Sequence, residues 1–207
     1  MRNGAGRLDP MPPPSVFSAL GLFVREGFLS PAERADVERA MRESVGGPAG
    51  VYGEATRGRR HASELSVDAG LAHRMAAAVA ALGADLQRHF HVRLSDAEPP
   101  SFLRYVPGDH YAAHRDRPDA RVDAAASRRA VSVVIFVNGP DGPDGFEGGR
   151  LRCYGLLGEG LAEIGMDMDP VAGTLVAFES GLLHEVTPVA AGTRYSIASW
   201  FSAHESG

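Results

Sequence analysis

The chain has little that would tie it to an oxidising compartment or to a membrane. Only one of its 207 residues, Cys153, is a cysteine, so no internal disulfide can form and a reducing compartment fits. No stretch approaches the roughly 20 apolar residues that a membrane-spanning helix needs. Residues 1–14 are interrupted by charges and prolines and lack the apolar run of a signal peptide. We therefore expect a cytoplasmic protein without a membrane partner.

The chain also lacks an excess of positive charge. It has 21 Lys and Arg residues against 26 Asp and Glu residues, which gives a formal net charge of −5. Such a balance gives no electrostatic reason to expect a nucleic-acid partner. Apolar residues make up 44% of the chain, as in ordinary globular proteins. We predict a flexible Gly- and Pro-rich segment over residues 1–15, followed by a single domain over 16–207.

The first part of the domain is predicted to be helical support. Ser30-Pro31-Ala32-Glu33 has the residue order of a capping box, with proline at the first helical position. A helix over about Pro31–Ser44 should follow, ended by Gly46-Gly47-Pro48. Alanines and leucines at helical spacing predict one long helix from Asp68 to about Phe90. We assign residues 16–100 to this supporting region.

The second part of the domain is predicted to consist of short strands separated by Gly, Pro and Asp turns. Strands that are this short and this regularly spaced indicate a sandwich or a jelly roll, with its core over residues 101–202. Helices followed by strands predict the α+β class, with the helices packed on one face of the larger sheet. The predicted strands are Phe102–Val106, Tyr111–His114, Val131–Asn138, Gly149–Tyr154, Gly173–Phe178, His184–Val189 and Arg194–Phe201.

Three segments outside these elements carry charges or look irregular. Residues 117–130 are interpreted as a mobile lid over the mouth of the barrel, because they are small and of mixed charge. The segment Met166–Pro170 has too few regularly spaced oxygen donors for a calcium loop, so we interpret it as a solvated turn. The arginines at positions 57, 59 and 60 are interpreted as a solvated surface.

Candidate metal ligands occur on two of the predicted strands. Alternation along a strand places His114 and Asp116 on the same face, as two ligands of a 2-His-1-carboxylate triad. His184, in a second strand-like run, is the candidate third ligand. Each residue alone could be structural, but the combination on facing strands predicts an Fe(II) site with free positions for a co-substrate and dioxygen. The same ligands would also accept Mn(II), Co(II), Ni(II) or Zn(II).

An arginine is predicted on the inner face of the last strand. A buried guanidinium is costly unless it meets an anion, and a ligand carboxylate held by the planar fork of Arg194 would satisfy it. Ser196 on the same face, and Tyr105 on the facing strand, could donate further hydrogen bonds. The alternative interpretation is a salt bridge at the rim, with Glu179 or Glu185 as the partner.

Together these motifs resemble one enzyme superfamily over residues 101–201. The chain is similar to the 2-oxoglutarate and Fe(II)-dependent dioxygenases, and most similar to their prolyl 4-hydroxylase branch. Each matching piece alone is common, but the set occurs here in the order of the family. The pieces are Arg104–Gly108, Tyr111–Asp116, Val131–Asn138, Phe146–Leu151, Pro170–Phe178, His184–Pro188 and Gly192–Trp200.

The resemblance implies a double-stranded β-helix, which is a jelly roll, with iron on His114, Asp116 and His184. It also implies that Arg194 pairs with the distal carboxylate of 2-oxoglutarate, that Tyr105 donates to it, and that ascorbate is a candidate reductant. The expected reaction is hydroxylation of a C–H bond, with dioxygen as oxidant and succinate and CO₂ as co-products. Family members that halogenate have a small residue in place of Asp116, so the retained carboxylate favours hydroxylation.

Both the substrate and the function stay open between alternatives. A prolyl or other residue of a peptide or protein is favoured by the resemblance, while free amino acids and small metabolites are hydroxylated on the same scaffold. A cupin-like metalloenzyme that does not use 2-oxoglutarate would leave Arg194 without a role. A catalytically silent jelly-roll binding module would be expected to have lost part of the triad, and the triad is complete.

Overall fold

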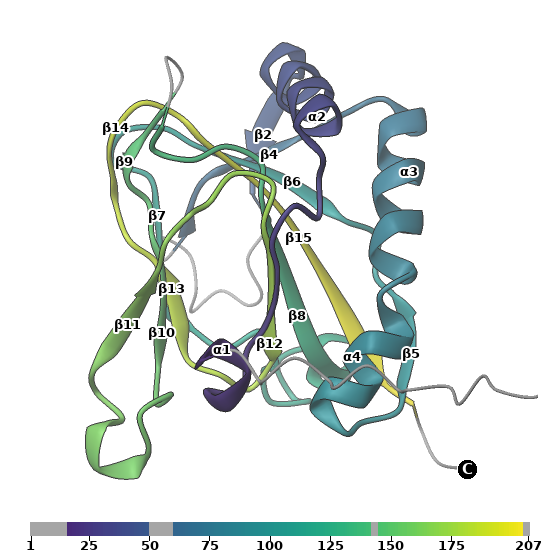
Figure 1. Ribbon diagram of the computed structural model, residues 1–207, viewed down its shortest axis with the longest axis vertical. Helices are drawn as coiled ribbons and strands as arrows, with labels where there is room; N and C mark the ends of the chain where they lie inside the picture. The colour runs from purple at the N-terminus through teal and green to yellow at the C-terminus, as the bar shows by residue number, and fades with distance from the viewer. Residues whose placement is uncertain (1–15, 50–59, 142–144, 205–207) are drawn as a thin grey trace, which may run out of the picture.

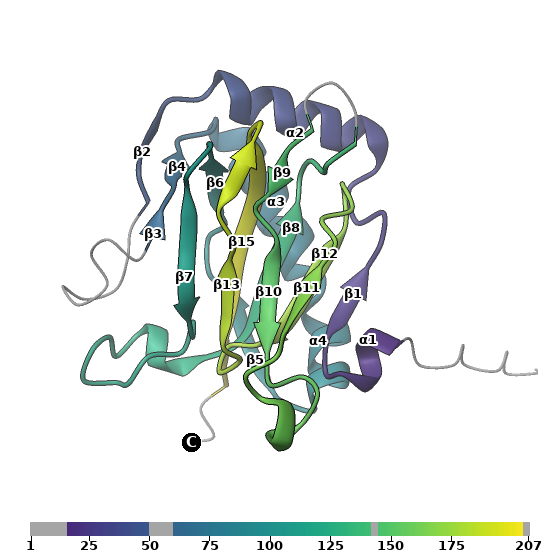
Figure 2. The ribbon, with the colours of Figure 1, turned by 90° about the vertical axis from the view of Figure 1, so that its left-hand side faces the viewer.

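The computed structural model describes residues 16–49, 60–141 and 145–204. Two antiparallel sheets lie against each other, and the longer helices cover the outer face of the larger sheet (Figures 1 and 2). This arrangement confirms the predicted α+β fold with a jelly-roll core and helices that buttress it. No helix in the described ranges is both long and apolar enough to cross a bilayer. The predicted flexible segment, residues 1–15, lies outside the described residues.

The larger sheet is built around its two longest strands, β8 and β15. The segment Arg129–Phe136 reads as a nearly continuous run of β-branched and apolar residues, because both faces of β8 are covered. The strands run in the order β1-β12-β8-β15-β6-β4-β2, and β5 pairs with the far end of β15. Their bounds are β1 Phe23–Arg25, β2 Gly46–Pro48, β4 Ser63–Leu65, β5 Leu94–Ala97, β6 Ser101–Tyr105, β8 Arg129–Phe136, β12 Leu175–Glu179 and β15 Arg194–Ala203.

The smaller sheet supplies the opposite wall of the barrel. It runs in the order β11-β10-β13-β7-β3 (Figure 2), and a separate two-stranded ribbon pairs β14 with β9 (Figure 1). Every pairing in both sheets is antiparallel. The bounds are β3 Arg60–His61, β7 His110–His114, β9 Glu147–Gly148, β10 Leu151–Tyr154, β11 Gly165–Met168, β13 His184–Val186 and β14 Val189–Ala191.

The helices follow the capping signals of the sequence with one exception. Helix α2 begins at Pro31, and the capping box is complete, since Ser30 Oγ accepts from the Glu33 amide at 3.3 Å and Glu33 Oε2 accepts from the Ser30 amide at 2.9 Å. The long helix predicted from Asp68 is two helices, because the chain breaks after Ala80 and restarts at Gly83. The helices are α1 Val16–Ala19, α2 Pro31–Glu43, α3 Ala69–Ala80 and α4 Gly83–Phe90, with 3₁₀ turns at Ala126–Arg128 and Glu159–Leu161.

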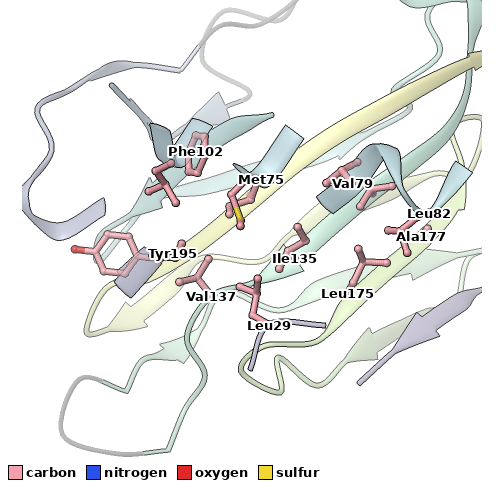
Figure 3. Close-up of a cluster of buried hydrophobic side chains, with 14 of the residues drawn as sticks. Leu29, Met75, Val79, Leu82, Phe102, Ile135, Val137, Leu175, Ala177 and Tyr195 are labelled. Atoms are coloured by element: carbon pink, nitrogen blue, oxygen red, sulfur yellow. The ribbon is translucent and has the colours of Figure 1, made fainter. Parts of the chain in front are cut away.

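The main hydrophobic core lies between the helices and the larger sheet. Helix α3 contributes Met75 and Val79, and Leu82 follows in the short link to α4. All three belong to the same cluster as Ile135 and Leu175 of the sheet (Figure 3). A second cluster, which includes Phe136 and Phe178, lies between the two sheets. The larger sheet is therefore buried on both faces, and it forms a rigid wall on which a site can be built.

Two segments that were not predicted to be strands form edge strands. The helix ends at Glu43, before Gly46-Gly47-Pro48 as expected, but these three residues then form strand β2, which pairs with β4 at the sheet edge. Met166–Pro170 is not a solvated turn, because Gly165–Met168 forms β11 and pairs with β10. Edge strands need partners on only one side, so their short polar sequences carry little strand signal. The predicted supporting region, residues 16–100, accordingly contains five short strands as well as helices.

Candidate active site

Three side chains with metal-binding atoms meet inside the barrel. One ligand atom from each of His114, Asp116 and His184 lies within 4.8 Å of the others. The two carboxylate oxygens of Asp116 divide between the imidazoles, with Oδ1 3.4 Å from His114 Nε2 and Oδ2 3.6 Å from His184 Nε2. Their side chains are only 12%, 12% and 5% exposed in chain order. The three residues that the sequence singles out are therefore brought together, with space between their ligand atoms for one metal ion.

Strand pairing sets the distance between the two imidazoles. His184 begins β13 directly opposite His114, the last residue of β7. Asp116 lies beyond the end of β7, so strand alternation does not place it as the sequence suggests. A bend after His114 turns the chain, and the Arg117 amide then donates to Ser180 O at 3.0 Å. The carboxylate therefore reaches the imidazoles because of a bend that is fixed by a backbone hydrogen bond.

Both imidazoles are oriented by backbone carbonyls. His114 Nδ1 lies 3.0 Å from Ala112 O, and His184 Nδ1 lies 3.0 Å from Leu182 O. A carbonyl oxygen can only accept, so each Nδ1 carries the proton and each Nε2 presents its lone pair to the centre of the site. This is the tautomer that a metal-binding histidine needs, and the fixed donor keeps each ring from rotating.

The burial and charges of the site favour the metal-binding protonation states of Asp116 and His184. Burial lowers the pKa of His184 to about 4, which keeps the imidazole neutral near pH 7. Burial alone would raise the pKa of Asp116, but His184, His114 and a hydrogen bond from Trp200 outweigh it and lower the pKa below its usual range. A neutral imidazole and an ionised carboxylate can bind a metal without first releasing protons.

Each of the two imidazoles also contacts an aromatic ring. The ring of Tyr111 stacks on His114, with centroids 3.5 Å apart and planes inclined by 15°. Phe178 meets His184 edge-on at 4.7 Å. The contacts restrict the motion of both imidazoles and cover them with apolar surface, which strengthens electrostatic interactions within the site.

The second chemical feature of the barrel is a buried arginine. Arg194 begins β15 opposite Tyr105 of β6, and both side chains are 1% exposed. Its Nη1 donates to Ser196 Oγ at 2.8 Å, while its buried Nε has no hydrogen-bond partner. The guanidinium carbon lies 5.0 Å from the centre of the Tyr105 ring and 5.7 Å from that of Phe136. Burial lowers the pKa of Arg194, and no carboxylate in the described part of the chain pairs with it.

The rim salt bridge that was the alternative for Arg194 is not formed. Glu185 instead accepts a hydrogen bond from Tyr154 Oη at 2.8 Å and lies 3.4 Å from an Arg152 nitrogen on the outer face of the smaller sheet. Glu179 is exposed and lines a different groove. An uncompensated guanidinium in an apolar wall is costly, so its donors are suited to an anion from outside the chain.

The metal-binding triad and the arginine open into the same cavity. It has a volume of about 210 Å³, and its wall includes Tyr105, His114, Asp116, His184, Arg194 and Trp200. A dicarboxylate could therefore reach the metal position with one end and Arg194 with the other. The triad, the orphaned Arg194 Nε and the shared cavity fit an iron ion with an anionic chelating co-substrate.

Sequence reasoning missed three residues of this cavity as site residues. Trp200 contributes the hydrogen bond to Asp116, and Tyr111 contributes the stacking on His114. Arg60, interpreted as solvated surface, lines the cavity mouth with its guanidinium carbon 4.9 Å from the centre of the Tyr111 ring. Strand alternation, which places Trp200 on the face of Arg194, was the available signal for the tryptophan. The other two arginines of that interpretation, at positions 57 and 59, lie outside the described residues.

Comparison with known proteins agrees with this geometry. Residues 100–202 match the family model of the 2OG-Fe(II) oxygenase superfamily. A prolyl 4-hydroxylase of Pseudomonas putida has a similar structure, with a TM-score of 0.66 and 31% identity over 89% of this chain and 94% of that one. A prolyl hydroxylase of Trichoplax adhaerens, solved with a peptide of hypoxia inducible factor, has a TM-score of 0.69 at 19% identity and shows the fold alone.

Curated relatives match a shorter part of the chain. A PKHD-type hydroxylase of Thioalkalivibrio sulfidiphilus is 36% identical over 93 residues, which are 45% of this chain and 38% of the relative. One from Shewanella sp. strain ANA-3 is 30% identical over 105 residues, which are 51% of this chain and 43% of the relative. The matched region thus spans about two fifths of these relatives. The family model and the near full-length likeness to the Pseudomonas enzyme show that the chain belongs to the 2OG-Fe(II) oxygenase superfamily, whose members are dioxygenases that use Fe(II) and 2-oxoglutarate.

Proposed function

We propose that this protein is a hydroxylase that consumes 2-oxoglutarate and dioxygen to convert a substrate C–H bond into C–OH. One oxygen atom enters the substrate and the other enters succinate, as 2-oxoglutarate loses CO₂. The observation that carries the proposal is the shared cavity, which joins a His-Asp-His cluster to a buried arginine without a carboxylate partner. Ascorbate is the candidate reductant for iron that becomes oxidised without turnover.

His114, Asp116 and His184 are proposed to hold the iron. Their Nε2 and carboxylate oxygen atoms converge, and the backbone carbonyls and aromatic rings described above hold the imidazoles in place. When bound, Fe(II) supplies the electrons that activate dioxygen. The three protein ligands leave the remaining coordination positions open, which suits a chelating co-substrate together with dioxygen.

Arg194 is proposed to bind the distal carboxylate of 2-oxoglutarate. Its Nη1 is already oriented by Ser196, and its unpartnered Nε faces a buried environment where a charge-assisted hydrogen bond is strong. Ser196 would orient the fork, and Tyr105 would close the pocket beside it and donate a further hydrogen bond. Because no carboxylate of the described residues competes for the guanidinium, the site favours an acidic co-substrate.

The primary substrate is proposed to be a prolyl or other residue within a peptide or protein. The cavity of about 210 Å³ is below the roughly 300–1,000 Å³ usual for pockets that enclose a whole small ligand. With the co-substrate inside, it leaves space for only one small group of the primary substrate, so the rest must lie outside. The likeness to a prolyl 4-hydroxylase at 31% identity supports the same class.

Succinate release tests the whole proposal. The protein is first titrated anaerobically with Fe(II) and 2-oxoglutarate, and a weak visible charge-transfer band that requires both components is expected. Proline-containing peptides and free amino acids are then compared for substrate-dependent succinate formation. Stimulation by free amino acids alone would replace the peptide substrate with a small metabolite. A folded protein that gives no band would contradict the function and favour a binding module.

A further inference from the structure

A second arginine near the cavity is held in a fixed position by a carboxylate. Arg129, the first residue of β8, is only 3% exposed. Its Nε donates to Glu98 Oε1 at 2.7 Å, and its Nη2 makes a second short contact with Glu98 Oε2, so the pair is bidentate. The backbone of Glu98 is in turn bonded to β15, since its amide donates to Trp200 O at 2.7 Å and its carbonyl accepts from Ser199 Oγ at 2.8 Å.

This arginine covers the tryptophan that contacts the metal-binding cluster. The guanidinium carbon of Arg129 lies 3.9 Å from the centre of the Trp200 ring, which is close packing for a cation–π contact. The indole can only donate, and Trp200 lies with Asp116 in the wall of the same cavity, where its hydrogen bond contributes to the lowered pKa of that carboxyl. A continuous chain of contacts therefore runs from Glu98 through Arg129 and Trp200 to a candidate metal ligand.

We propose that Arg129, clamped by Glu98, is a positioning residue that sets the indole of Trp200 and through it the metal-binding orientation of Asp116. Neither residue of the pair touches a ligand atom of the triad, so its influence passes through the tryptophan. Asp116 lies outside the strand, so strand pairing does not hold its side chain as it holds the two histidines. The fixed indole supplies that restraint. This inference rests on the proposed function only in taking His114, Asp116 and His184 as metal ligands.

A second pair in the molecule shows what such an arrangement does away from the site. Arg25 pairs with Asp85 and lies with its guanidinium carbon 5.4 Å from the centre of the Phe23 ring. It too joins a carboxylate to an aromatic ring, but no candidate metal ligand contacts this ring through a hydrogen bond. Arg25→Gln is therefore a matched control for Arg129→Gln, because both variants lose an ion pair and a contact with a ring.

Tryptophan fluorescence reports on the surroundings of this indole alone, because Trp200 is the only tryptophan in the sequence. We would measure tryptophan emission and acrylamide quenching in metal-free protein, and then titrate Mn(II) while following free Mn(II) by electron paramagnetic resonance. In Arg129→Gln we expect red-shifted emission, easier quenching and a Mn(II) dissociation constant raised by roughly threefold to tenfold, near the lower end of effects of outer-shell residues. Glu98→Gln should shift all three in the same direction by less, and Arg25→Gln should shift none.

The outcomes separate the inference from the function on which it rests. If wild-type protein binds no Mn(II), the proposed metal site fails. If wild type binds Mn(II), and folded Arg129→Gln shows unchanged emission and affinity, the pair is structural and the inference is overturned. Should Arg129→Gln fail to fold, Arg129→Lys keeps the charge but not the fork and should still weaken Mn(II) binding. Trp200→Phe keeps a ring without the donor, and unchanged Mn(II) affinity in that variant would also overturn the inference.

Discussion

Two arginines on adjacent strands of the larger sheet show opposite solutions to the same physical problem. Arg129 on β8 and Arg194 on β15 are 3% and 1% exposed, so each guanidinium has lost most of its water. Arg129 has a counter-ion, because its Nε and Nη2 make a bidentate contact with the carboxylate of Glu98. Arg194 has only a serine hydroxyl, and its Nε has no partner. Because burial without a counter-ion is costly, the second arrangement indicates a place for an anionic ligand.

The comparison teaches that partner chemistry, rather than burial, separates a structural charge from a functional one. Both arginines also face aromatic rings, at 3.9 Å for Arg129 and 5.0 Å for Arg194, so ring contacts do not distinguish them. The distinguishing feature is the presence of a carboxylate. Arg129 has its counter-ion within the chain and can position its neighbours, whereas Arg194 has none among the described residues and is suited to a ligand carboxylate.

The largest expected effect falls on the candidate metal ligands, which share a cavity with Arg194. Asp116→Ala removes the only carboxylate of the triad and should abolish Mn(II) binding and 2-oxoglutarate turnover, because two imidazoles alone bind a divalent ion weakly. The fold should persist, since Asp116 lies in a bend outside the strands. Metal titration, succinate release and circular dichroism measure the three quantities. Full turnover in this variant would remove the assignment of the metal site.

Arg194→Met should show the next largest effect, and it should be selective for the co-substrate. Loss of one partner from a buried charge pair costs about 3 kcal/mol, which is roughly 100-fold in the 2-oxoglutarate dissociation constant. The free energy of unfolding without ligand should be unchanged or higher, because an apolar side chain of similar length replaces an uncompensated charge. Isothermal titration calorimetry measures the 2-oxoglutarate dissociation constant, and urea unfolding measures the free energy of unfolding. An unchanged 2-oxoglutarate affinity would remove the anchoring role.

Arg129→Met makes the same substitution on the other arginine and should show the reverse pattern. It leaves the Glu98 carboxylate without its partner, and that side chain is 32% exposed, so we expect a loss of about 1–3 kcal/mol in the free energy of unfolding. The 2-oxoglutarate affinity should change far less than in Arg194→Met when both are measured at saturating metal. If the two substitutions change the 2-oxoglutarate affinity and the free energy of unfolding equally, the proposed difference between the two arginines is wrong.

The sequence predicted well what depends on local pattern and on residue chemistry. The capping box at Ser30, the apolar run of β8 and the triad of His114, Asp116 and His184 all carry signals within a few residues, or rest on a ligand set that few functions share. That these three side chains converge was predicted partly for the wrong reason, because Asp116 is placed by a bend rather than by strand alternation, and their role as metal ligands stays a prediction. Side-chain chemistry thus constrained the site more firmly than the assumed backbone did.

What the sequence did not predict depends on contacts between distant residues. The segment Gly165–Met168 is a strand because β10 is beside it, and neither its length nor its polarity indicates a strand by itself. Glu98 and Arg129 are 31 residues apart, and nothing in the sequence pairs this glutamate with that arginine. The role of Trp200 likewise follows from where the bend places Asp116. Such features arise from tertiary packing, which local sequence patterns do not encode.

The smallest predicted effect tests whether the chain holds the guanidinium of Arg194 in place. Gly149 has a φ of +56°, and a Cβ there would meet Arg194 Cδ at 2.9 Å and Val189 Cγ2 at 3.0 Å. Gly21 has a similar φ of +78° but open space around the Cβ position. Alanine at either position should lower the free energy of unfolding by about 1–2 kcal/mol, because the alanine backbone would have to adopt the left-handed region.

Only Gly149→Ala should also weaken 2-oxoglutarate binding. The added methyl group displaces the stem of Arg194, and a charge-assisted hydrogen bond to a carboxylate depends on the direction of the fork as well as on its charge. We expect a severalfold rise in the dissociation constant for Gly149→Ala and none for Gly21→Ala, measured by titration on metal-loaded protein. If both glycine variants bind 2-oxoglutarate like wild type, the guanidinium finds the carboxylate without help from its neighbours. The difference between the two arginines would then lie only in their partners and not in how firmly the chain holds them.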